Sequence, residues 1–134
     1  MKLNYIKKIS YNKLNAKQKE SYNYQKVSAI LADYGYVSYR MHDDYQGADF
    51  HAVNIDGHVL KIQLKARVTV DKKYLNKNIF ITFSEDRVIW YLYPHDEIFK
   101  VITTHSNAAM SHQARSIKSI PKWLFPILEK YKID

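Results

Sequence analysis

The sequence predicts a single α/β domain with a mixed β-sheet of about five strands flanked by helices. The chain has 134 residues, which suits one domain with its own hydrophobic core. An amphipathic helical pattern near the N-terminus is followed by five short runs rich in β-branched and aromatic residues. Further helical patterns come after the last of these runs, and this order is typical of a layered α/β or α+β architecture.

The first helix has clear boundaries in the sequence. Residues 1–13 are basic and polar, and we expect them to form a loose arm. Asn15 is a suitable N-cap for a helix that runs to about Asp33, and Gly35 is suited to the left-handed position that ends it. The apolar stripe of this helix consists of Val27, Ile30, Leu31 and Tyr34.

The remaining elements follow in order after this helix. The expected strands cover residues 36–41, 48–53, 59–67, 79–83 and 88–93. Residues 42–47 form a turn-rich link, in which Asp43 and Asp44 are expected to cap a turn. Pro94 suits the first turn of a short helix, and a last helix is expected from about Pro121. The polar segment 103–118 receives no assignment.

The hairpin formed by the second and third strands has a predictable register. Side chains alternate between the two faces of a strand, and the apolar set Ala48, Phe50, Ala52, Leu60, Ile62 and Leu64 must share the core face. A two-residue turn would bring Asp49 onto that face. A three-residue loop over residues 55–57 avoids this conflict and places Gly57 at a left-handed bulge position. Asp49 is then expected opposite Gln63, and His51 opposite Lys61.

This register gathers Asp49, Gln63 and Lys65 on one polar face. Carboxylate and amide oxygens are hard ligands suited to Mg²⁺ or Mn²⁺, which retain several waters and need few protein ligands. Lys65 can position the attacking water or stabilise charge on a phosphate. The pattern therefore indicates metal-dependent phosphodiester hydrolysis. A solvated sheet face without a function would show the same alternation.

The charge distribution points to a polyanionic partner. The net charge is +8, yet residues 41–64 carry one Lys against four Asp, so an acidic island lies between basic flanks. A metal site within a phosphate-binding groove has this charge pattern, and nucleic acid, in particular DNA, is the expected partner. The side chains expected to contact its backbone are Lys61, Arg67, Lys72 and Lys73. The same residues also suit an ordinary solvated loop.

Asp49 followed after thirteen residues by Gln63-Leu64-Lys65 resembles the motif of the PD-(D/E)XK nuclease superfamily. This resemblance covers about residues 15–100 and implies a restriction-endonuclease-like three-layer core. It implies that Asp49 binds metal and that Lys65 is catalytic. Gln63 stands where the second acidic ligand usually stands, and Ala48 replaces the proline of the motif's name.

Many members of that superfamily carry a glutamate on the first helix. Glu20 is the acid that this resemblance assigns to the catalytic and metal-binding set, although Gln25 lies nearer the expected position. Two alternatives to an enzyme stay open. The chain is either a catalytically degenerate nuclease fold that binds nucleic acid or protein, or a homo-oligomer, such as a homodimer, with tyrosines at its interface.

Several classes of function lack support in the sequence. There are no cysteines, which excludes disulfides, Cys-ligated zinc and thiol catalysis. No apolar run approaches the ~20 residues that cross a bilayer, and no secretory signal is visible at the N-terminus. We therefore expect a cytoplasmic protein that does not enter the membrane. No Gly-rich phosphate loop or zinc-protease motif is present.

Overall fold

The N-terminal helix has the boundaries that the sequence predicts. The computed structural model describes residues 3–45, 47–105 and 114–134. Helix α1 (Ala16–Asp33) begins at a capping box, in which Asn15 Oδ1 accepts from the Gln18 backbone N–H and Gln18 Oε1 accepts from the Asn15 backbone N–H. Gly35 follows the C-cap in a left-handed conformation with φ of 83°, as expected for a helix stop.

The main sheet has six strands rather than about five. Its strands are β1 (Tyr36–Tyr45), β2 (Ala48–Asn54), β3 (Val59–Leu64), β5 (Ile79–Phe83), β6 (Trp90–Pro94) and β8 (Lys132–Ile133), hydrogen-bonded in that order. All neighbouring pairs are antiparallel except β3 and β5, which are parallel. The sheet is therefore mixed, as predicted.

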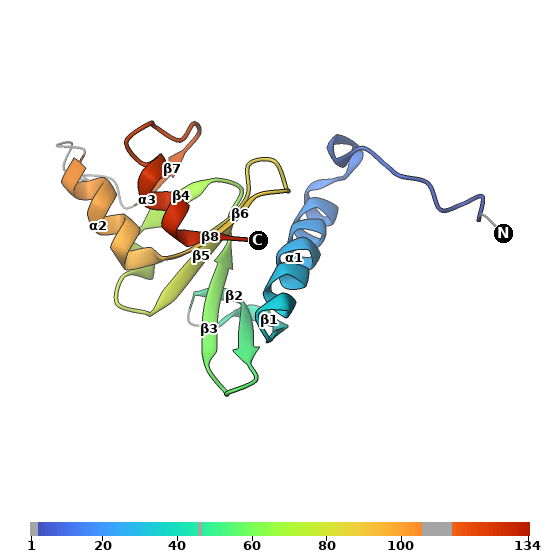
Figure 1. Ribbon diagram of the computed structural model, residues 1–134, viewed down its shortest axis with the longest axis horizontal. Coiled ribbons are helices and arrows are strands. Elements are labelled where there is room, and N and C mark those ends of the chain that lie inside the picture. Colours follow the sequence, from blue (N-terminus) through green and yellow to red (C-terminus); the bar gives the residue numbers. More distant parts are fainter. Residues whose placement is uncertain (1–2, 46, 106–113) are drawn as a thin grey trace.

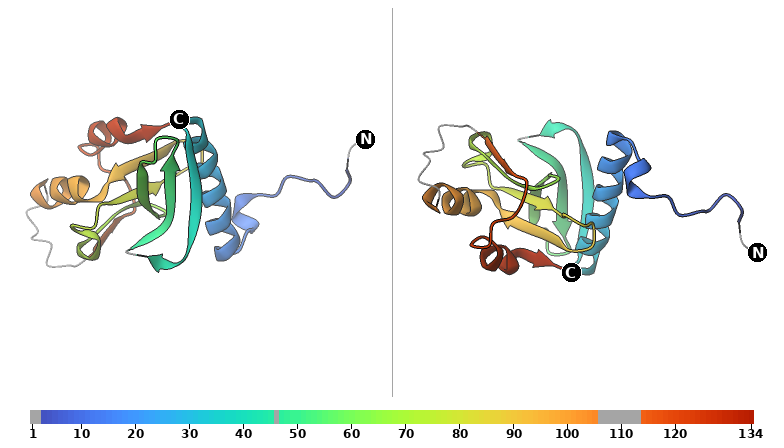
Figure 2. Two further views of the ribbon diagram at one scale, coloured as in Figure 1. Left: turned by 90° about the horizontal axis from the view of Figure 1, so that it is seen from below. Right: turned by 90° about the horizontal axis from the view of Figure 1, so that it is seen from above.

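Helices cover both faces of this sheet and produce three layers (Figure 2). On one side, Val27 and Leu31 of α1 pack with Phe50, Ile62 and Trp90 of the sheet. On the other side lie α2 (His95–His105) and α3 (Phe125–Leu128), with a core that includes Ile81, Phe83, Tyr93, Ile98, Ile102, Leu124 and Leu128. Alternation along β5 and β6 thus supplies apolar side chains to both cores.

A second, two-stranded sheet was not predicted. It pairs β4 (Val68–Asp71) with β7 (Ala114–Ile117) in antiparallel register. Tyr93 fixes one edge of β4, since its hydroxyl donates to the Thr69 carbonyl at 2.7 Å and accepts from the Thr69 N–H at 3.0 Å. In the polar segment 103–118, residues 106–113 lie outside the described part of the chain.

Several boundaries differ from the sequence-based expectation. Strand β6 begins at Trp90 and not at residue 88, and Pro94 ends this strand, so α2 begins at His95 without a proline in its first turn. Strand β1 continues to Tyr45, so Asp43 and Asp44 lie within a strand and not in a turn; its pairing with β2 shifts register between Arg40 and Tyr45. Strand β3 ends at Leu64. The last helix, expected from about Pro121, is reduced to α3, which is followed by a 3₁₀ turn, η3 (Glu129–Tyr131). Proline is tolerated only in the first turn of a helix, so α3 begins next to Pro126.

The N-terminal arm is shorter than expected. Residues 3–10 carry no helix or strand and extend away from the body beside α1 (Figure 1). Tyr11–Lys13, which was also predicted to be loose, forms a 3₁₀ helix, η1, packed against α1. None of the helices in the described ranges combines the length and apolar character needed to span a membrane.

Candidate active site

The β2–β3 hairpin adopts the register predicted from its turn. Phe50 pairs with Ile62, and His51 pairs with Lys61. Gly57 has a φ of 85°, and its N–H donates to the Asn54 carbonyl at 2.8 Å. Continuing this register places Asp49 opposite Gln63, with Lys65 two residues along the chain from Gln63.

A hydrogen bond holds the Asp49 carboxylate, and burial restricts the Gln63 side chain. Asp49 Oδ2 accepts a hydrogen bond from the Leu64 backbone N–H at 2.8 Å, which orients the carboxylate towards β3. Gln63 is 6% exposed as a residue, and its Oε1 has no hydrogen-bond partner among the described residues. A buried acceptor without a partner is costly, so this oxygen is a candidate ligand atom.

The four predicted catalytic residues line one cleft. Glu20, Asp49, Gln63 and Lys65 all contribute to a cleft of about 450 Å³, which lies between the first turns of α1, the start of β2 and the end of β3. Glu20 and Asp49 also line an adjoining hollow of about 140 Å³. Gln25, the alternative to Glu20, is exposed and does not line the cleft.

Arg40 pairs with the helix acid at this site. Its Nη2 lies 3.2 Å from Glu20 Oε1, and its guanidinium carbon lies 4.7 Å from the centre of the Tyr24 ring. Both partners of the ion pair are well exposed, so solvent weakens their attraction. The pair is therefore open to exchange with an incoming cation or phosphate.

Tyr74 is a neighbour of the site that the sequence did not indicate. It is buried, and the ammonium groups of Lys65 and Lys73 lie 5.6 Å and 5.2 Å from its ring centre. Burial raises the pKa of the Tyr74 hydroxyl, Lys73 opposes that shift, and Asp49 adds to it. The ring thus holds two cations close to the cleft through cation–π attraction.

The side chains that were predicted to contact the DNA backbone lie in two places. Lys61 lies on the hairpin opposite His51, whereas Arg67, Lys72 and Lys73 are exposed beyond the end of β3. Lys72 and Lys73 belong to a 3₁₀ turn, η2 (Lys72–Tyr74).

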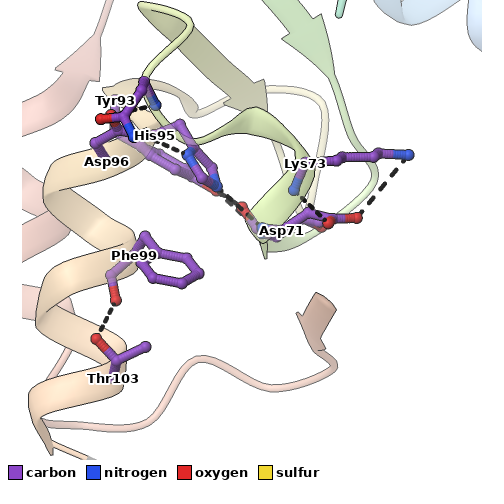
Figure 3. Close-up of polar contacts among 9 residues, drawn as sticks. Asp71, Lys73, Tyr93, His95, Asp96, Phe99 and Thr103 are labelled. Carbon is purple, nitrogen blue, oxygen red and sulfur yellow. Dashed lines mark hydrogen bonds and ion pairs between the residues drawn. The ribbon is translucent and has the colours of Figure 1, made fainter. Parts of the chain in front are cut away.

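A buried histidine fixes this basic turn, as Figure 3 shows. His95 Nε2 accepts from the Asp71 N–H at 2.9 Å, and His95 Nδ1 lies 2.9 Å from Asp96 Oδ1. Because the backbone N–H must donate, Nδ1 carries the ring proton and donates to Asp96 in this arrangement. Asp96 in turn accepts from the Asn76 N–H at 3.0 Å. His95 was not singled out in the sequence, since its isolated position shows no motif.

The donor set fits a hard divalent cation. Asp49 and Glu20 provide carboxylates, and Gln63 provides a buried amide oxygen that lacks a partner among the described residues. No group of three His, Cys, Asp or Glu side chains that could hold a metal was found within the described ranges. A cation here would therefore depend on Gln63 and on water for part of its coordination.

Comparison with known proteins identifies the class of fold. Among solved structures, a bacterial homing endonuclease matches with a TM-score of 0.50 and 16% sequence identity, over 87% of this chain and 94% of the other. The chain thus has a nuclease-like α/β fold. No protein-family model matches it, and no curated protein matches it by sequence.

Proposed function

We propose that the protein is a metal-dependent nuclease of the PD-(D/E)XK type that hydrolyses DNA phosphodiester bonds. The observation that carries the proposal is the shared cleft of Glu20, Asp49, Gln63 and Lys65, in which the Gln63 oxygen is buried without a partner among the described residues. The nuclease-like fold and the net charge of +8 support it. The proposed substrate is DNA, and the proposed location is the cytoplasm. The proposal is compatible with a homodimer.

Each residue then has a stated role. Asp49, Gln63 and Glu20 hold Mg²⁺ or Mn²⁺, which when bound polarises the phosphodiester and activates water. The Leu64 N–H keeps the Asp49 carboxylate directed towards β3. Lys65 places a positive charge beside the scissile phosphate and stabilises the charge that develops on its oxygens. Lys61, Arg67, Lys72 and Lys73 bind the DNA backbone.

A cleavage assay tests this proposal. Labelled single-stranded, duplex and branched DNA are incubated with the protein in Mg²⁺, Mn²⁺ or EDTA. Asp49→Ala and Lys65→Ala should each reduce the cleavage rate about 10²-fold or more. Lys122→Ala, an exposed lysine outside the cleft, provides the matched control. Absence of cleavage on every substrate, or equal rates for wild type and both variants, would refute the proposed nuclease activity.

Two observations favour a second function, that of a catalytically degenerate nuclease fold that binds nucleic acid or protein. Gln63 is neutral where an acid is expected, and Arg40 already pairs with Glu20. Salt-sensitive DNA binding without cleavage would support this function.

A further inference from the structure

A row of cations held on tyrosine rings extends from the cleft along α1. Tyr11 and Lys19 both line the cleft. The Arg87 guanidinium carbon lies 4.0 Å from the centre of the Tyr11 ring, and Lys19 Nζ lies 5.3 Å from it. Residues from η1, from α1 and from the β5–β6 turn thus meet at one aromatic ring. This turn lies beside the start of α1 (Figure 1).

The row continues along the helix. The Tyr11 and Tyr22 rings meet edge to face at 5.3 Å, and Lys26 Nζ lies 5.3 Å from the centre of the Tyr22 ring. Lys19, Tyr22 and Lys26 are spaced three and four residues apart, so they share one face of α1. Asn23, next to Tyr22, donates to the Tyr11 hydroxyl at 2.9 Å and fastens η1 to this face.

The cations of this row form no ion pair with the acids of the described residues. Within that part of the chain, the Lys and Arg side chains with an acidic oxygen inside 4.0 Å are Arg40, Lys73 and Lys132. Lys19, Lys26 and Arg87 are not among them. Their charges are therefore available to an external anion, while cation–π contacts restrict their motion before it binds.

The β5–β6 turn is built to present Arg87. Arg87 has a φ of 64°, and its N–H donates to Ser84 Oγ at 2.8 Å. Asp86 Oδ1 accepts from the N–H groups of Val88 and Ile89, so the nearest acid is occupied within the turn. The strained backbone at Arg87 is stabilised by these bonds and directs the side chain to Tyr11.

We propose that Lys19, Lys26 and Arg87 form a phosphate track that guides the backbone of one nucleic-acid strand along α1 into the cleft. The track rests on the proposed nuclease function for the class of its ligand. Lys19 and Lys26 are seven residues apart, or about 10 Å of helix rise. Measured along the axis of duplex DNA, this length corresponds to about three nucleotides of one strand. The track consists of residues other than Arg67, Lys72 and Lys73, and it enters the cleft at Lys19, which lines the cleft together with Lys65.

Salt-dependent DNA binding tests the track without any cleavage. Fluorescence anisotropy with a labelled duplex is measured in EDTA over a range of KCl concentrations. The triple variant Lys19→Gln, Lys26→Gln, Arg87→Gln should bind at least tenfold more weakly than wild type. It should lower the slope of log Kd against log salt by about 0.9 for each phosphate that the variant no longer neutralises. The control triple Lys118→Gln, Lys122→Gln, Lys130→Gln removes the same charge from exposed positions near the C-terminus.

Two outcomes would overturn the track. Equal loss of affinity in both triple variants would mean that net charge alone drives binding, and unchanged affinity in the first triple would exclude these residues as DNA-binding groups. The single variant Lys26→Gln, at an exposed position, tests the track even if the triple variant misfolds. It should lower the slope of log Kd against log salt by about one.

The same preparations separate this proposal from the nuclease itself. Asp49→Ala keeps the three track residues and removes a negative charge from the cleft, so in EDTA it should bind duplex at least as tightly as wild type. If no protein cleaves DNA while the triple variant still has a reduced salt slope, the nuclease fails and the track stands. If wild type cleaves and the triple variant shows an unchanged KM and Kd, the track fails and the nuclease stands.

Discussion

Asp49 Oδ2 accepts a hydrogen bond from the backbone N–H of Leu64 at 2.8 Å, which joins a carboxylate on β2 to the residue between Gln63 and Lys65. One carboxylate thus serves the hairpin and the candidate site together. The two roles can be separated, because an amide keeps the acceptor and loses the charge.

Asp49→Asn and Asp49→Ala should therefore differ in stability and agree in activity. The alanine variant leaves the partly buried Leu64 N–H without its acceptor and should lose about 1–3 kcal/mol of unfolding free energy. The asparagine variant should stay within about 1 kcal/mol of wild type, the usual scale of a neutral hydrogen bond. Urea denaturation measures the difference, and both variants should lose cleavage. Equal stability of the alanine variant and wild type would contradict the role of this bond.

Gln63→Glu should lower the stability of the metal-free protein and raise its affinity for metal. A buried second carboxylate near Asp49 repels it, so the metal-free variant should unfold at lower urea concentration than wild type. Mn²⁺ binding, measured by titration calorimetry, should become about tenfold tighter or more, which corresponds to ~1.4 kcal/mol.

Gln63→Met provides the control for that experiment. It removes the unpartnered oxygen at nearly constant volume, so the metal-free protein should be as stable as wild type or more so. Its affinity for Mn²⁺ should fall. Unchanged Mn²⁺ affinity in both Gln63 variants would exclude this side chain as a ligand.

Gly57→Ala should destabilise the hairpin through its backbone alone. The residue has a φ of 85°, and an added Cβ would meet no atom within 4 Å, so no clash contributes. The expected loss is about 1 kcal/mol, seen as a lower urea midpoint. Gly57→Asn should lose less, because asparagine tolerates the left-handed region. A loss from alanine no larger than that from asparagine would contradict this account.

Asp86 should make the β5–β6 turn sensitive to acid. Hydrogen bonds from the Ile89 and Val88 N–H groups lower the pKa of this carboxyl below its ordinary value of 3.8. Its stabilising effect is complete above pH 3.8 and is lost as the pH falls through the lowered pKa. Asp86→Asn should therefore be less stable than wild type at pH 7, by a few tenths of a kcal/mol for so exposed a group. The difference should shrink towards pH 2.

Thermal unfolding between pH 2 and 7 measures this effect. Glu85→Gln makes the same change of charge one residue earlier, at an exposed position. It should show no comparable gap that closes on acidification. A gap for Asp86→Asn that persists at pH 2 would mean that the carboxylate charge is not its cause.

The geometry of the candidate site was predictable where local rules and the apolar pattern agree. Gly57 favours a left-handed turn, and the alternation around Phe50 and Ile62 permits one register, so the position of Asp49 followed from the sequence. The capping box at Asn15 and the stop at Gly35 were equally local. Each of these features depends on residues that lie close together in the chain.

Features that depend on distant pairing were missed. Strands β4 and β8 are four and two residues long, and each exists because a remote partner, β7 or β6, satisfies its backbone. Propensity in such short runs is too weak to indicate a strand. Tyr74 and Arg87 likewise reach the site through tertiary contacts with Lys65 and Tyr11, which no spacing in the sequence reveals.

The contact between Tyr11 and Arg87 has a consequence for the order in which the parts of the candidate site form. The β2–β3 hairpin is contiguous and can form in microseconds, whereas this ring contact joins remote segments and closes a long loop. We therefore expect the Tyr11–Arg87 contact to form after the hairpin that carries Asp49, and to be lost before it on unfolding. Hydrogen exchange should accordingly be faster at the Arg87 amide, which is bonded within the β5–β6 turn, than at the Leu64 amide, which is bonded to Asp49.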